Sequence, residues 1–224
     1  MYKNIMVIPY RKREEHLKYF IDKTVPLIKQ TMPDTKVVVV EQAEGKLFNR
    51  GKVLNVGFKE YMDKTEYFIT HDVDINPNIE IVKELYTKNE DIISIYSAHK
   101  ISLGGIIKIK HNILFDINGF PNNIWGWGIE DRALYFRSYI KNIPITRYTN
   151  NKKKLKFLKH KSNASEYRGI KKNISDMWSL NHINKLNNKQ KEELIFSTGL
   201  NNLEYKIIER KKLHDIVELI KVEI

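Results

Sequence analysis

The chain has 224 residues, of which 42% are hydrophobic and 11% aromatic, so it can bury a full core and wholesale disorder is excluded. Its 39 Lys and Arg outweigh 27 Asp and Glu, and the formal net charge of +12 favours anionic partners such as nucleotides or nucleic acid. The absence of cysteine excludes disulfides and thiolate chemistry, and together with the lack of a signal sequence or long apolar segment it predicts a cytoplasmic protein without a membrane span.

The first half alternates short β-rich runs with helical patterns, which predicts βαβ units. Strands are expected at 5–9, 36–41 and 66–72, and helices at 14–28 and 49–62. These elements predict an α/β fold with a mixed, largely parallel central sheet.

The second half has β-rich patterns at 91–97 and 104–117 and a helical one at 130–140. A lysine-rich stretch and a polar segment follow up to about residue 200, and two β-like runs, 203–210 and 216–224, close the sequence. No repeat and no flexible linker interrupts the chain. We therefore expect a single domain whose C-terminal third is less regular.

Basic residues follow the first two expected strands. Arg11 and Arg13 lie in "PYRKR" (9–13), where guanidinium groups suit the paired oxygens of a diphosphate. In "FNRGK" (48–52), Phe48 offers a face for a flat base and Arg50 reaches phosphate. The alternative for each motif alone is a solvated basic turn.

Two carboxylates one residue apart, Asp72 and Asp74, end the third expected strand. Carboxylates at the end of a buried strand are costly unless they bind a cation or a sugar hydroxyl. A capping turn before Pro77 is the alternative. In an open α/β sheet, ligands bind beyond the carboxyl ends of the strands, which is where these residues lie.

The stretch "NNIWGWGIED" (122–131) places tryptophans between glycines and ends on adjacent carboxylates. Sugars pack on aromatic faces while their hydroxyls meet carboxylates. Trp127 is therefore expected to be a sugar platform on a glycine-hinged loop, with Asp131 or Glu130 as general base. For Trp125 we favour a role as a loop anchor.

Together these motifs resemble the catalytic domain of the β-1,4-galactosyltransferase family, glycosyltransferase family 7. The matching segments, in the family's order, are "PYRKR", "FNRGKVLNVG", "DVD", "GG", "NGFPNNIWGWGIED", "KFLKHK" and "GLNNLEYKI". The resemblance implies a GT-A fold over residues 1–224, with 1–100 mainly binding the UDP-sugar and 101–224 mainly binding the acceptor.

The resemblance also implies an inverting, Mn²⁺-dependent transfer of galactose or N-acetylgalactosamine from a UDP-sugar to a sugar hydroxyl, with a β-1,4 linkage. It assigns the roles of base to Asp131 with Glu130, of metal ligands to Asp74 and His160, and of acceptor contacts to Trp127, Gly128 and Ile129. The donor contacts that it implies are Pro9, Arg11, Arg13, Phe48, Arg50, Asp72, Val73, Ser102 and Gly105.

Several positions depart from the family pattern. Ile129 replaces a glycine and Arg132 replaces a carboxylate, which reshapes the acceptor side and makes it more positive. Phe157 stands where relatives have a methionine metal ligand. Ser102 stands where a tyrosine is associated with galactose, so we expect UDP-N-acetylgalactosamine to be used at least as well as UDP-galactose, unless Ile101 fills the space.

Two other functions remain open from the sequence. The charge and the "KKKLKFLKHK" stretch are compatible with a nucleic-acid-binding protein, although lysine is abundant throughout the chain. A UDP-sugar hydrolase is the other alternative. We expect a carbohydrate acceptor and no nucleic-acid partner, and the oligomeric state is left open.

Overall fold

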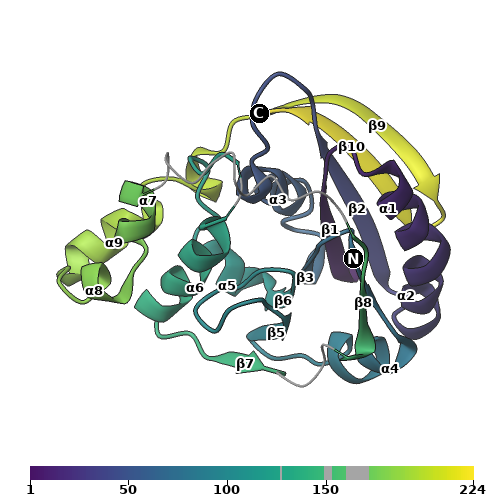
Figure 1. The fold of residues 1–224 in the computed structure, drawn as a ribbon, viewed down its shortest axis with the longest axis horizontal. Helices are drawn as coiled ribbons and strands as arrows, with labels where there is room; N and C mark the ends of the chain where they lie inside the picture. The colour runs from purple at the N-terminus through teal and green to yellow at the C-terminus, as the bar shows by residue number, and fades with distance from the viewer. Residues whose placement is uncertain (127, 149–152, 160–171) are drawn as a thin grey trace.

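The computed structural model describes residues 1–126, 128–148, 153–159 and 172–224. Its centre is an eight-stranded sheet with the order β7-β5-β6-β3-β1-β2-β10-β9 (Figure 1). The pairs β5–β7, β1–β3, β1–β2 and β2–β10 are parallel, and the other pairs are antiparallel. The expected α/β fold with a mixed, largely parallel sheet is confirmed.

The strands of the main sheet are β1 (Tyr2–Tyr10), β2 (Thr35–Gln42), β3 (Thr65–His71), β5 (Ile92–Tyr96), β6 (Ile106–Lys110), β7 (Ile145–Arg147), β9 (Lys206–His214) and β10 (Val217–Glu223). A small second sheet pairs β4 (Ile75–Pro77) with β8 (Leu155–Phe157). The central strands β1 and β2 are apolar on both faces because helices cover both sides of the sheet.

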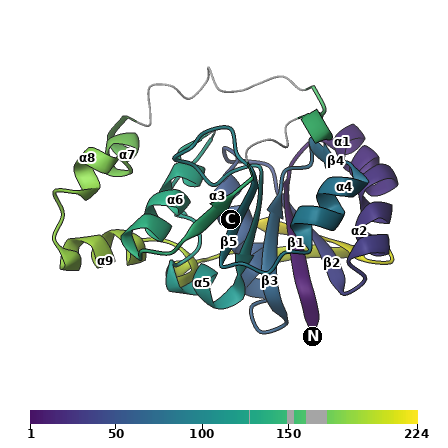
Figure 2. The same cartoon turned by 90° about the horizontal axis from the view of Figure 1, so that it is seen from below.

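Helical segments form the two outer layers, which Figure 2 shows on opposite sides of the strands. One layer contains α1 (Glu14–Tyr19), η1 (Phe20–Thr24), α2 (Val25–Thr31), α4 (Ile79–Ile81) and η2 (Val82–Tyr86). The other contains α3 (Arg50–Glu60), α5 (His111–Asp116) and α6 (Glu130–Ile140). Alternate residues of β1 serve the two cores, with Met6 and Ile8 facing the first layer and Ile5 and Val7 the second.

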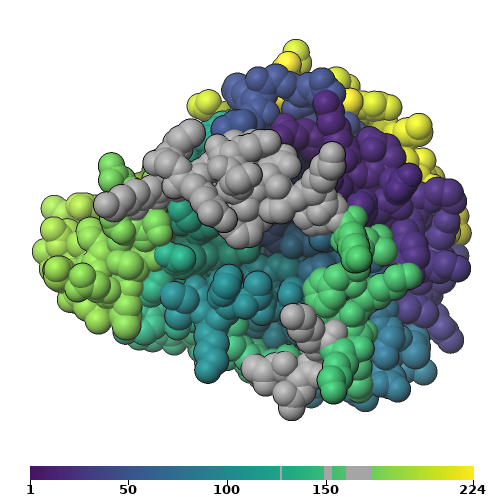
Figure 3. All heavy atoms as spheres, viewed as in Figure 1, coloured from purple at the N-terminus to yellow at the C-terminus, as the bar shows by residue number. Residues whose placement is uncertain are grey.

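The C-terminal third is more regular than expected. The helices α7 (Lys172–Met177), α8 (Leu180–Ile183) and α9 (Asn188–Phe196) form one end of the molecule in Figure 3. Trp178, Ile183 and Leu194 pack with Ala133 and Phe136 of α6 in a separate apolar cluster. A short helix η5 (Leu200–Asn202) then leads to β9 and β10.

Within the expected β-rich run at 104–117, only Ile106–Lys110 is a strand, and α5 begins at His111. Ile113, Leu114 and Ile117 are buried in the core beneath α3, at the spacing of one helical face. Tertiary burial of this face outweighs the β propensity of its isoleucines. No helix in the described ranges is long and apolar enough to cross a membrane.

Candidate active site

The candidate site lies where β3 ends and α3 and α6 begin. Asn49 caps α3 by accepting a hydrogen bond from the backbone N of Lys52 (2.8 Å), and Arg50 is the first residue of the helix. Asp72 directly follows β3, and Asp131 is the second residue of α6. Three segments that are distant in the sequence thus direct charged side chains toward one point.

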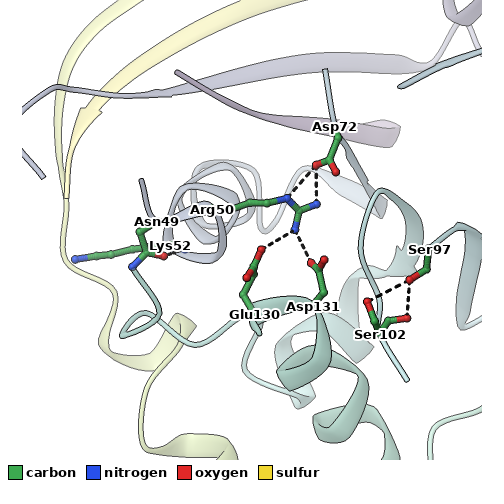
Figure 4. Close-up of polar contacts among 8 residues, drawn as sticks. All are labelled: Asn49, Arg50, Lys52, Asp72, Ser97, Ser102, Glu130 and Asp131. Carbon is green, nitrogen blue, oxygen red and sulfur yellow. Dashed lines mark hydrogen bonds and ion pairs between the residues drawn. The ribbon is translucent and has the colours of Figure 1, made fainter. Parts of the chain in front are cut away.

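Arg50 is the centre of this group (Figure 4). Its Nε and Nη2 donate to Oδ1 of Asp72 at 2.9 and 2.8 Å, and its Nη1 donates to Oδ1 of Asp131 at 2.7 Å. Glu130 Oε1 lies 3.8 Å from the same Nη1. One guanidinium therefore links a predicted donor-binding carboxylate to the predicted base.

Burial governs the proton affinities of this group. It raises the pKa of Asp131 well above the ordinary value; the positive charge of Arg50 opposes this shift, and Glu130 and Asp72 add to it. Burial alone would lower the pKa of Arg50, but the surrounding carboxylates raise it, so the guanidinium stays charged. A carboxyl group with a raised pKa, beside a permanent cation, suits a general base that acts near neutral pH.

Glycines let the charged side chains come close. A Cβ on Gly104 would lie 2.0 Å from Oδ2 of Asp131, so a side chain there would displace the carboxylate. The backbone N of Leu103 also donates to the carbonyl O of Asp131 at 2.9 Å. At Gly51, a Cβ would meet Phe120 Cβ at 3.0 Å. The predicted "GG" motif therefore fits tightly against the start of α6.

The turn that leads into α6 is strained. Ile129 precedes the helix with φ of 79°, in the left-handed region that β-branched residues avoid. Gly126 and Gly128 have φ of 78° and 85°, which glycine adopts freely. Strain of this kind collects at functional sites, where it fixes the direction of neighbouring groups. Here Ile129 determines how Glu130 and Asp131 enter the helix.

The predicted nucleotide contacts also lie together. The guanidinium carbon of Arg11 lies 5.2 Å from the centre of the Phe48 ring, and its Nη1 donates to the carbonyl O of Lys46 at 2.7 Å. The carbonyl O of Phe48 accepts a hydrogen bond from the backbone N of Gly126 (2.7 Å), which joins this loop to the tryptophan stretch.

The other two predicted nucleotide contacts occupy the end of the first strand and the start of the first helix. Pro9 is buried within β1, opposite Val40. Arg13 precedes α1 and is half-buried.

The predicted metal ligands are described in part. Asp74 is half-buried, and its carbonyl O accepts a hydrogen bond from the backbone N of Leu158 at 2.8 Å, which joins the Asp-Val-Asp turn to the end of β8. His160 and the acceptor residue Trp127 lie outside the described residues. Within the described ranges, no three His, Cys, Asp or Glu side chains form a metal-binding group. Of the two predicted metal ligands, the described residues contain Asp74, whose carboxylate is a group that Mn²⁺ accepts.

The remaining predicted donor residues are Gly105, Val73 and Ser102, of which Gly105 contacts Asp72 through the backbone. Gly105 has φ of 70°, and its carbonyl O accepts a hydrogen bond from the backbone N of Asp72 (3.1 Å). Val73 is buried in the core. Ser102 is 9% exposed, and its hydroxyl lies 3.2 Å from Oγ of Ser97 (Figure 4).

Sequence patterns missed the residues that hold these segments together. The amide of Asn55 in α3 donates to Phe120 O and Asn122 Oδ1 at 2.7 and 2.9 Å. The buried Arg137 of α6 donates to carbonyl groups of the turn at 117–119 and of Thr198. Burial lowers the pKa of Arg137 to about 9. The "NGFPNN" and "GLNN" segments thus support the site, and their several asparagines were the feature of the sequence that could have indicated this role.

Two family models match the chain. A model described as the N-terminal region of glycosyl transferase group 7 matches residues 1–87. A second, described as the N-terminal domain of galactosyltransferase, matches residues 87–161. The matched ranges include Arg50, Asp72 and Asp131, the three residues at the centre of the site.

Similar proteins cover most of the chain. β-1,4-Galactosyltransferase 1 of Bos taurus is 31% identical over 217 residues, which are 93% of this chain and 51% of the relative. β-1,4-Galactosyltransferase 4 of Homo sapiens is 34% identical over 151 residues, 63% of this chain and 44% of the relative. The chain thus spans about half the length of these curated relatives.

A solved structure shares the fold. It is a mutant of Drosophila β-1,4-galactosyltransferase 7 in complex with manganese, UDP-Gal and xylobiose. The TM-score is 0.78 at 23% sequence identity, and the match covers 100% of this chain and 94% of that chain. The expected GT-A type fold is confirmed.

Proposed function

This chain belongs to the glycosyltransferase group 7 family, and from that membership we propose that it moves a hexose from a UDP-sugar to a hydroxyl group of a carbohydrate acceptor. The observation that carries the proposal is the contact of Arg50 with both Asp72 and Asp131. It brings a phosphate-binding cation, a donor-binding carboxylate and a base to one point, as glycosyl transfer requires.

The residues divide the reaction between them. Phe48 binds the base of the nucleotide, and the guanidinium groups of Arg11 and Arg50 offset the negative charge of its diphosphate. Asp131 removes the proton from the acceptor hydroxyl as its oxygen attacks the anomeric carbon, and the bond from that carbon to the UDP oxygen breaks. The proton stays on Asp131 and UDP leaves with its electron pair. A single displacement of this kind inverts the anomeric configuration.

A divalent metal fits the donor side. Asp74 provides a hard oxygen ligand of the type that Mn²⁺ accepts. The turn that contains Asp74 is hydrogen-bonded to Leu158, directly after β8, and His160 follows two residues later in the sequence. Asp74 and His160 would hold Mn²⁺, which would supply positive charge to the leaving diphosphate. The manganese and UDP-Gal in the related Drosophila structure support this assignment.

The sugar transferred is galactose or N-acetylgalactosamine, and the linkage is β-1,4. The names of the similar proteins support galactose. The position of Ser102 in place of a larger residue supports the N-acetyl sugar. The xylobiose in the related structure supports a carbohydrate acceptor.

The test measures UDP release from a panel of UDP-sugars with Mn²⁺, with and without monosaccharide acceptors. We expect release that depends on UDP-galactose or UDP-N-acetylgalactosamine and increases with an acceptor. Equal release without any acceptor would identify a UDP-sugar hydrolase. No release with any donor, together with salt-sensitive binding of nucleic acid, would contradict the proposal in favour of a nucleic-acid-binding protein.

A further inference from the structure

A tyrosine that no sequence motif contains lies beside the donor carboxylates. Tyr96 is the last residue of β5, and a register shift between Ser94 and Tyr96 places it opposite Ile106 of β6. Irregularities of this kind redirect a side chain and are frequent next to active sites. The Tyr96 side chain is half-buried, so it packs on the core with part of its surface accessible.

The ring of Tyr96 lies against the Gly-Gly turn. A Cβ on Gly105 would be 2.7 Å from Cδ1 of Tyr96, so only glycine leaves room for the ring there. The same Gly105 accepts the backbone hydrogen bond of Asp72. The ring also contacts Phe157 in a tilted arrangement, with 4.9 Å between the ring centres and 57° between the ring planes.

The charges around Tyr96 agree with this position. The pKa of its phenol is raised, first by burial and then by the negative charges of Asp74 and Asp72. The carboxylates of Asp72 and Asp74, which follow β3, thus act electrostatically on the phenol, in agreement with the contact of the ring with Gly105. Aromatic rings and carboxylates are the two kinds of group that bind the apolar face and the hydroxyls of a sugar.

The order of the strand ends indicates which part of a donor reaches Tyr96. Phe48 and Arg11 lie near the ends of β2 and β1, Asp72 follows β3, and β6 and β5 come next in the sheet. A donor with its nucleotide at Phe48 and its diphosphate near Asp72 extends its sugar toward β6 and β5. Gly105 and Tyr96 lie there.

We propose that the ring of Tyr96 is a platform for the donor sugar, on which the C–H face of the hexose packs while its hydroxyl groups reach Asp72. The inference rests on the proposed function, because it requires a UDP-hexose in the site. It assigns Tyr96 to the sugar, whereas Phe48 and Arg11 bind the nucleotide. A variant of Tyr96 should therefore affect UDP-hexose and spare UDP.

Calorimetry with UDP and with UDP-galactose, both with Mn²⁺, tests this separation. Tyr96→Leu keeps apolar packing but removes the aromatic face, Tyr96→Phe restores the face, and Tyr139→Ala removes an exposed tyrosine (43% exposed) near the far end of α6. We expect Tyr96→Leu to bind UDP-galactose roughly two- to tenfold more weakly and UDP within about twofold of wild type. Tyr96→Phe and Tyr139→Ala should match wild type with both ligands.

The other outcomes overturn the inference. Equal weakening of UDP and UDP-galactose by Tyr96→Leu would assign the ring to the nucleotide or the metal, and no change with either ligand would make Tyr96 a packing residue. If wild-type protein binds both ligands and Tyr96→Leu gives one of these results, the platform alone is contradicted. Wild-type protein that binds neither ligand contradicts the proposed function as well.

Discussion

Arg50 shows how much of the site depends on single residues. Its guanidinium contacts Asp72 and Asp131, which come from different parts of the chain. The motifs that contain these three residues were recognisable in the sequence, but their direct contact was not, because it depends on how α3 and α6 meet at the end of β3. Tyr96 was missed for a related reason, since its position depends on an irregularity in β5.

Replacement of Asp131 by Asn should abolish transfer and spare donor binding. An amide cannot accept the acceptor's proton, and loss of a general base typically lowers the rate by ~10²–10⁴-fold. The measurements are kcat with the preferred donor and the affinity for UDP. Asp63→Asn, on an exposed turn after α3, is the matched control and should leave both unchanged. If Asp131→Asn kept most of the wild-type kcat, Asp131 would not be the base, and Glu130 would be the next candidate.

The dependence of the transfer rate on pH should also be determined by Asp131. Because burial raises the pKa of Asp131, the base is protonated over a wider acidic range than an ordinary aspartate. Wild-type kcat/KM should therefore fall as the pH is lowered through this raised pKa, well above the usual value of 3.8. The residual activity of Asp131→Asn should lack this acidic limb.

Replacement of Ser102 by Tyr should move donor preference toward UDP-galactose. Ser102 is buried, and its hydroxyl lies against that of Ser97, so a tyrosine needs additional space at this position, and we expect its ring to occupy the space beside the donor sugar. Steric exclusion of one substituent changes kcat/KM by roughly ten- to two-hundredfold. The measurement is the ratio of kcat/KM for the two donors. Ser97→Ala, which adds no volume, should leave the ratio unchanged, and an unchanged ratio in Ser102→Tyr would show that this position does not face the donor.

At the scale of elements, the strands and the longer helices were predictable from the pattern of apolar residues. The exceptions are instructive. α5 buries only Ile113 and Leu114, together with Ile117 at its C-cap, within a run rich in β-branched side chains. The polar segment before Leu200 has few apolar residues, and Trp178, after α7, and Ile183, at the end of α8, pack against residues of α6. In both cases tertiary packing determines the secondary structure, and the local sequence pattern carries no information about that packing.

The start of α6 gives an element-scale prediction. At residue 129, with φ of 79°, glycine avoids the steric cost that alanine pays. Ile129→Gly should therefore be more stable than Ile129→Ala by about 1 kcal/mol in the free energy of unfolding, measured in urea. The same pair at the exposed Glu193 in the interior of α9 is the control and should have the opposite order. Greater stability of Ile129→Ala would mean that the residue does not keep this backbone conformation in solution.

At the scale of the whole molecule, metal and nucleotide should stabilise the fold jointly. The described residues offer Asp74 but no complete metal-binding group, so the UDP diphosphate is expected to supply further ligands. A ligand that binds the native state raises its stability according to concentration and affinity. Mn²⁺ alone should shift the midpoint of thermal unfolding little, whereas Mn²⁺ with UDP should shift it more than the sum of the separate effects.

Asp74→Asn provides the control for this prediction. It should remove the increment that Mn²⁺ adds and keep the shift caused by UDP alone, because Asp74 is expected to act on the metal. Tight binding of Mn²⁺ to wild-type protein without nucleotide would contradict the prediction and require a complete set of protein ligands.

The strand order has a consequence for the synthesis of the protein. β10 pairs in parallel with β2 and antiparallel with β9, and Val217 is aligned with Val37 from the opposite half of the sequence. On the ribosome, β2 emerges early and can pair with β1, but its other edge has no partner until residues 217–223 have been translated. During that interval an apolar strand edge is open to other chains, a known cause of aggregation in nascent and overexpressed proteins. Production of this protein should therefore benefit from slow translation or from a chaperone that covers an exposed strand.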